Sequence, residues 1–149
     1  MSGNFLTNFM RLALQKTGAE RALAAADDLS IVATQNLEQA DLMSSQFTGI
    51  EVIRRALDNG EPIITNNAVM DPNLAPVTNT NFSNLRVVVV IPVEEYGAIY
   101  LDQHIRRGVI PRDVVLRLWT LAIQLVDSGQ MDISEADLDA LYQQEADSL

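Results

Sequence analysis

Cysteine is absent from this sequence of 149 residues, and histidine occurs once, at His104. The missing thiol excludes disulfides, thiolate metal sites, cysteine nucleophiles and thioether-linked cofactors. A lone imidazole beside Arg106 and Arg107 is typical of a solvated or structural loop residue and not of a catalytic base. The carboxylates do not have the spacing of a calcium loop, and no glycine-rich loop could cradle phosphates. We therefore expect neither an enzyme nor a cofactor.

Positive charge is also scarce, since 10 Lys and Arg residues face 20 Asp and Glu residues and the net charge is -10. This imbalance disfavours nucleic acid and anionic membrane surfaces as partners. The N-terminal segment MSGNFLTNFM lacks the basic and apolar regions of a signal peptide, and no window approaches the roughly 18 apolar residues of a transmembrane helix. We therefore expect a cytoplasmic protein, folded around the core that 48% hydrophobic residues allow.

The clearest structural signal is a pair of strands in the second half of the chain. Residues 85–93 (LRVVVVIPV) form a continuous β-branched run, and residues 97–103 (GAIYLDQ) return after a short turn. A run without polar alternation is typical of a strand that is covered on both faces. Pro92 cannot donate a ladder hydrogen bond, so we expect it where its nitrogen has no neighbouring strand.

The other elements follow from hydrophobic periodicity, capping residues and turn formers. They are, in order, a helix over 4–16, a hairpin of strands 20–26 and 29–36, a helix over 48–59, a short strand at 63–65, a long connection over 66–84, a helix over 111–128 and an acidic helix from 134. The alanines of 20–26 count against that strand, because alanine favours helices. We expect one domain over 1–129 and an acidic C-terminal extension over 130–149.

Four segments, taken in this order, resemble the GAF domain, a sensory and regulatory family. They are LDNGEPIIT, NNAVMDPN, the strand pair LRVVVVIPV and GAIYLD, and the helix IPRDVVLRLWTLAIQLV. The resemblance covers roughly residues 4 to 128. It implies an α+β fold of the GAF-like (profilin-like) type, with a central antiparallel sheet and helices on both faces. It also implies a role in signal transduction, in which the domain binds a small molecule or dimerises and passes a conformational signal to an output domain.

The family places its ligand cavity between the sheet and the long loop, which here spans residues 66–84. The resemblance therefore implies ligand-binding candidates on this loop and on the strand pair: Asn66, Asn67, Asp71, Arg86, Tyr100 and Asp102. Without cysteine, the covalent bilin attachment and free methionine sulfoxide reduction found in the family are excluded. The ligand itself is not defined by these residues.

A cluster of basic residues stands out in so acidic a chain: Arg86, His104, Arg106, Arg107 and Arg112. Guanidinium groups could hold a ligand carboxylate or phosphate in bidentate geometry. The alternative is pairing within the chain, with Asp102, Glu94, Glu95 or Asp113.

The apolar stripes of the first helix (4–16) and the long helix (111–128) are wider than one sheet can cover. They predict a homodimer formed through these N- and C-terminal helices. The alternative to a ligand sensor is a protein-protein interaction module whose pocket is filled by its own side chains. The acidic last helix is either a solvated appendage or a docking helix for a basic partner surface.

Overall fold

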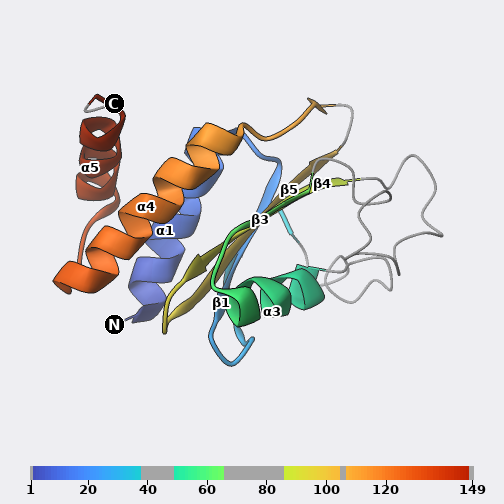
Figure 1. Ribbon diagram of the computed structural model, residues 1–149, viewed down its shortest axis with the longest axis horizontal. Helices are drawn as coiled ribbons and strands as arrows, with labels where there is room; N and C mark the ends of the chain where they lie inside the picture. Colours follow the sequence, from blue (N-terminus) through green and yellow to red (C-terminus); the bar gives the residue numbers. More distant parts are fainter. Residues whose placement is uncertain (1, 38–48, 66–85, 105–106, 148–149) are drawn as a thin grey trace.

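The computed structural model describes residues 2–37, 49–65, 86–104 and 107–147 (Figure 1). Nine elements follow in order: α1 (Ser2–Thr17), β1 (Arg21–Ala26), β2 (Ile31–Gln35), α3 (Gly49–Asn59), β3 (Ile63–Thr65), β4 (Arg86–Val93), β5 (Gly97–His104), α4 (Arg112–Ser128) and α5 (Glu135–Asp147). Within these ranges, none of the helices combines the length and the apolarity that a membrane span requires.

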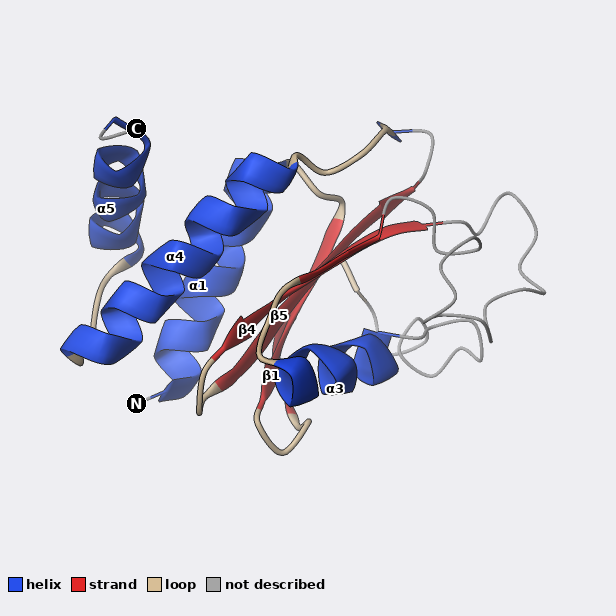
Figure 2. Cartoon of the chain, in the orientation of Figure 1, coloured by secondary structure: helices blue, strands red, loops and turns tan. Residues whose placement is uncertain are grey.

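The strands form one antiparallel sheet in the order β2-β1-β5-β4-β3. Helices α1 and α4 lie on one side of this sheet, with α5 beyond them, and α3 lies on the other side (Figures 1 and 2). The predicted α+β fold, a central antiparallel sheet with helices on both faces, is confirmed.

The strand pair β4–β5 lies at the centre of two apolar layers. Val87, Val89 and Ile91 belong to the layer shared with α1, α4 and α5, whereas Val88 and Val90 belong to the layer under α3. Successive side chains of β4 therefore meet the two helix layers in turn. This explains why the sequence of the strand shows no alternation of apolar and polar residues. The prediction of a strand covered on both faces is confirmed.

Pro92 lies in β4 at a place where the sheet has only one neighbour. It pairs with Ala98 of β5, while the pairing of β3 with β4 ends at Ile63 and Val90. On that side of β4 no strand within the described chain requires an N–H from position 92. The residue thus sits where the sequence predicted it.

The alanine-rich strand β1 is explained by its neighbours. Ala22 and Ala24 are fully buried in the layer that contains α1, where Phe5 and Phe9 stack with ring centroids 5.6 Å apart. Small side chains on the strand leave room for these two rings, so packing outweighs the helix preference of alanine.

The turn between β1 and β2 is built by Asp28. Its carboxylate accepts hydrogen bonds from the hydroxyl of Ser30 at 2.6 Å and from the backbone N–H of Ser30 at 2.9 Å. These bonds stabilise the ionised form and lower the pKa of Asp28 below its usual value. The turn expected from the paired aspartates is present.

Helix α5, which lies in the predicted extension, packs against α1 and α4. Leu138 and Tyr142 are buried in the layer shared with α1. Two ion pairs join α5 to α1: Arg11–Glu135 at 2.7 Å and Lys16–Asp139 at 2.5 Å. The apolar stripe of α1, which was predicted to contact a partner subunit, is thus covered by α5 of the same chain.

Gly97, the first residue of β5, lies where the backbones of β5 and β1 approach each other closely. Its φ is +155°, and a Cβ atom there would lie 1.9 Å from the carbonyl oxygen of Ala25. We expect Gly97→Ala to lower the free energy of unfolding by about 3 kcal/mol or more, because only backbone movement could relieve the clash. Chemical denaturation would measure the change.

The matched control is Gly129→Ala at the end of α4, where φ is +74° and, apart from its neighbours along the chain, no atom of a described residue lies within 4 Å of the added Cβ. We expect a loss of about 1–2 kcal/mol there, from the left-handed backbone alone. Equal losses in the two variants would contradict the close approach of β1 and β5.

Candidate functional site

The structure brings together part of the predicted ligand site. Three of its residues, Asn66, Asn67 and Asp71, lie outside the described residues. Arg86 opens β4, where its backbone pairs with His104. Tyr100 and Asp102 both lie on β5, two residues apart, and therefore share the face of the sheet that α3 covers.

One row of paired residues across the sheet contains Asp102, a charged residue that is fully buried. Val88 of β4 pairs with Asp102 of β5, and Asp102 pairs with Arg21 of β1. Directly opposite residues of antiparallel strands point to the same face, so this row lies on the α3 side. The neighbouring row, with Tyr100, is part of the apolar layer.

Arg21, Tyr100 and Asp102 form a buried polar group that we call the carboxylate cluster. The guanidinium of Arg21 donates from Nε to Oδ1 of Asp102 at 2.7 Å and from Nη2 to Oδ2 at 2.6 Å. The hydroxyl of Tyr100 donates to Oδ2 at 2.5 Å. The side chain of Asp102 is 0% exposed and that of Arg21 is 19% exposed. A charged group of three side chains thus lies next to the apolar layer on this face of the sheet.

The carboxylate cluster is held to the end of α1 through Glu20. The backbone N–H of Glu20 donates to the carbonyl of Asp102 at 3.0 Å, and its carboxylate accepts the backbone N–H of His104 at 2.5 Å. Arg107 adds a bond from Nη2 to the carbonyl of Gly18 at 3.2 Å. The connection from α1 to β1 is therefore bound to the end of β5 and to Arg107 just beyond it.

The chemistry available in the carboxylate cluster is recognition by hydrogen bonds and charge. Arg21 offers a planar fork for a carboxylate or phosphate, while Asp102 accepts from donors. Across the described ranges, no group of three His, Asp or Glu side chains could hold a metal ion.

The sequence analysis missed Arg21 and Glu20. Arg21 is the first residue of the strand RALAAA, where a single charged residue precedes five small or apolar ones. That position could have been noticed, but its pairing with Asp102 depends on the neighbour relation of β1 and β5 and on their register. Of the predicted basic residues, Arg107 bonds a carbonyl of the same chain and not a carboxylate.

No protein-family model matches the sequence, and no curated protein matches it significantly. Among solved structures, a GAF domain/HD domain protein from Geobacter sulfurreducens matches with a TM-score of 0.61 and 10% sequence identity. The match covers 96% of this chain and 94% of that chain. Together with the sheet and the helices on both of its faces, it confirms the predicted GAF-like fold.

The carboxylate cluster can be tested by removing one partner at a time. We expect Arg21→Met to lower the free energy of unfolding by about 3–5 kcal/mol, because it removes the charged partner of a buried carboxylate. Tyr100→Phe removes the hydrogen bond from the hydroxyl to Asp102 and should lower the free energy of unfolding by about 1.5–3 kcal/mol, the range for a hydrogen bond to a charged group. Urea denaturation of each variant would provide the values.

Two further variants serve as controls for this series. Arg54→Met removes an exposed pair with Glu51 and should change the free energy of unfolding by less than about 1 kcal/mol. The double variant Arg21→Met/Asp102→Leu replaces the buried pair by apolar side chains and should recover most of the loss. A double variant as unstable as Arg21→Met would show that the pair is not the source of the effect.

Proposed function

We propose that this chain is a regulatory domain that binds a small anionic molecule on the α3 side of its sheet. The observation that carries the proposal is the Arg21–Asp102 pair, in which the carboxylate is fully buried and the guanidinium is 19% exposed. A buried ion pair is no more stabilising than apolar side chains of similar size, so stability alone gives no reason for it. A guanidinium that already holds a carboxylate in bidentate geometry is suited to a ligand that presents the same group.

Recognition would proceed by exchange of partners. A ligand carboxylate or phosphate would take the place of Asp102 on the fork of Arg21, and Asp102 would keep the hydroxyl of Tyr100. The predicted site residues Arg86, Asn66, Asn67 and Asp71 are proposed to complete the contacts. The exchange leaves the buried carboxylate of Asp102 without its charged partner, so the contacts of the ligand must offset a cost of about 3–5 kcal/mol.

Transmission follows from the position of Arg21 and Asp102 on neighbouring strands. Their bonds cross from β1 to β5, and Glu20 joins the same place to the start of β1 just after α1. A ligand that separates Arg21 from Asp102 would therefore relax a link between the two strands next to the end of α1. Such a two-state link is what a sensory domain needs in order to signal to a partner.

A second candidate function is a protein-protein interaction module without a ligand. It is favoured by the three hydrogen bonds that Asp102 already accepts and by the side chains of the same chain that fill the α3 layer. Homodimerisation through α1 and α4 stays a prediction. Because α5 covers the apolar stripe of α1, only the stripe of α4 still supports the predicted dimer.

A thermal-shift panel of mono- and dicarboxylates, nucleotides and haem-like compounds separates the two functions. A compound present at ~100 times its dissociation constant should add roughly 2.7 kcal/mol to the stability of the native chain. We expect carboxylates or phosphates to give this shift and Arg21→Met/Asp102→Leu to abolish it. A silent panel, or a shift that the double variant retains, would reject the proposed site and favour the interaction module.

A further inference from the structure

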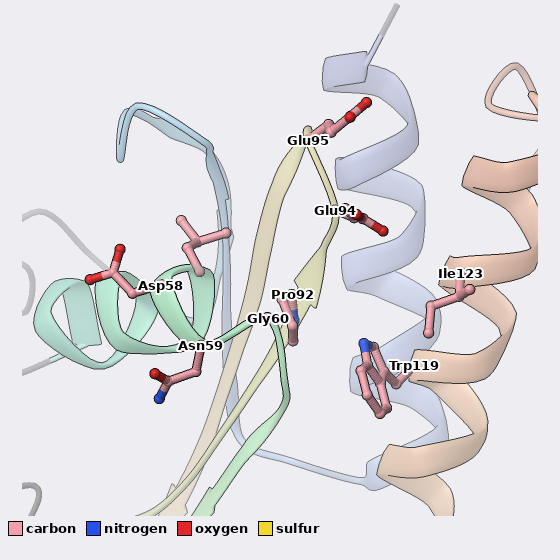
Figure 3. A pocket seen from close by; sticks show the side chains of 9 residues that line it. Asp58, Asn59, Gly60, Pro92, Glu94, Glu95, Trp119 and Ile123 are labelled. Atoms are coloured by element: carbon pink, nitrogen blue, oxygen red, sulfur yellow. The ribbon is translucent and has the colours of Figure 1, made fainter.

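A groove runs along α4 on the side that faces the end of α3 and the strand β3. It consists of two hollows of about 330 and 350 Å³ that share Trp119. Trp119 and Ile123 project from α4 toward Pro92 and Gly60 (Figure 3). We call this feature the tryptophan groove. It lies at the edge of the sheet where β3 no longer pairs with β4, away from the carboxylate cluster on β1 and β5.

The apolar wall of the groove is open to solvent. Ile123 is 37% exposed, and Leu116 and Trp119 are half-buried. The indole of Trp119 makes no hydrogen bond to any residue that the structure describes. Positions 116, 119 and 123 follow one another on one face of α4, and the outer two are about 10 Å apart along its axis.

The rim of the groove is acidic. Asp58, Glu94 and Glu95 border the first hollow, and Glu61 borders the second, opposite Arg112. These four side chains are exposed, and none forms an ion pair with a described residue. The three carboxylates of the first hollow, without counter-charges beside a half-buried tryptophan, favour a cationic occupant.

We propose that the tryptophan groove docks a basic segment of a partner protein, with an apolar side chain in each hollow and Lys or Arg facing Glu94 and Glu95. Leu116 lines one hollow and Ile123 the other, seven residues apart on α4, and this spacing fits anchors at positions i and i+7 of an amphipathic helix. A large apolar side chain against Trp119 gives the central contact, and the rim adds orientation and association rate. This docking surface goes beyond the proposed ligand site and does not depend on it.

A second copy of the chain is a poorer occupant of this face. Two copies would bring net charges of -10 together, with Glu94 and Glu95 of each copy near the same groove. Like charges placed together at an interface are unfavourable and suppress the wrong partner. The charge of the rim therefore favours binding of a basic partner over self-association through the stripe of Leu116, Trp119 and Ile123.

The chain carries its own reporter, because Trp119 is its single tryptophan. The probe is a synthetic helical peptide of Leu and Lys, with Leu at the anchor spacing of the groove and Lys elsewhere. The same peptide with Glu in place of Lys is its control. Titration of the native chain should give a saturable blue shift of tryptophan emission with the Lys peptide alone. Binding should weaken when the salt concentration is raised from ~0.1 M to ~1 M, because the Debye screening length falls from about 10 Å to about 3 Å.

Charge-matched variants distinguish docking in the groove from general attraction to an acidic protein. Glu94→Gln/Glu95→Gln should weaken binding about tenfold, whereas Asp132→Asn/Asp137→Asn should change it less than twofold at the same net charge. Among exposed apolar residues, Ile123→Ala should weaken binding and Val109→Ala, whose parent is 59% exposed, should not.

Three outcomes would overturn the proposal. They are equal weakening by both charge-matched pairs, an unchanged tryptophan spectrum while calorimetry detects binding, and a dimer in sedimentation equilibrium that Ile123→Asp converts to monomer. The first two place the peptide elsewhere on the surface. The third assigns the groove to a second copy of the chain.

Discussion

The burial of β5 on both faces is the constraint on which the rest of this structure depends. Seven of its eight residues are buried, and they separate the layer under α3 from the layer under α1, α4 and α5. A carboxylate in such a strand must find donors within the protein, because water cannot reach it. Asp102 finds them on β1 and on its own strand, and this requirement fixes the register in which β1 joins the sheet.

The sequence allowed the fold to be predicted where local chemistry and burial agree. The run Val87 to Ile91 meets apolar layers on both sides, so composition alone revealed it as a central strand. Tyr100 and Asp102 were named as candidates because the family resemblance implies a ligand cavity beside their strand, which the residue pattern had already predicted. Arg21 was missed because its partner lies 81 residues away, and no periodicity within β1 contains information about β5. The position of α5 was missed for a related reason: Arg11 and Lys16 on α1 meet its acidic residues only after the chain has folded.

The two proposed surfaces divide the sheet between them. The carboxylate cluster lies toward β1, near the end of α1, and the tryptophan groove lies at the other edge, between α3 and α4. Helix α3 is common to both, since its buried residues cover the layer that contains Tyr100 and its C-terminal end lines the groove. Occupation of either surface would therefore act on the same helix.

Pro92 has a consequence for how any protein can approach the sheet at the groove. An open strand edge ordinarily invites another chain to add a strand, since its N–H and C=O groups are free to pair. Here β3 is only three residues long, and beyond it β4 presents a residue that has no N–H to share. The ladder cannot be continued past this point, which protects the edge from fibre-like stacking of copies. A partner protein that binds at this edge must therefore be recognised by its side chains. The specificity of the groove depends on which residues the partner presents.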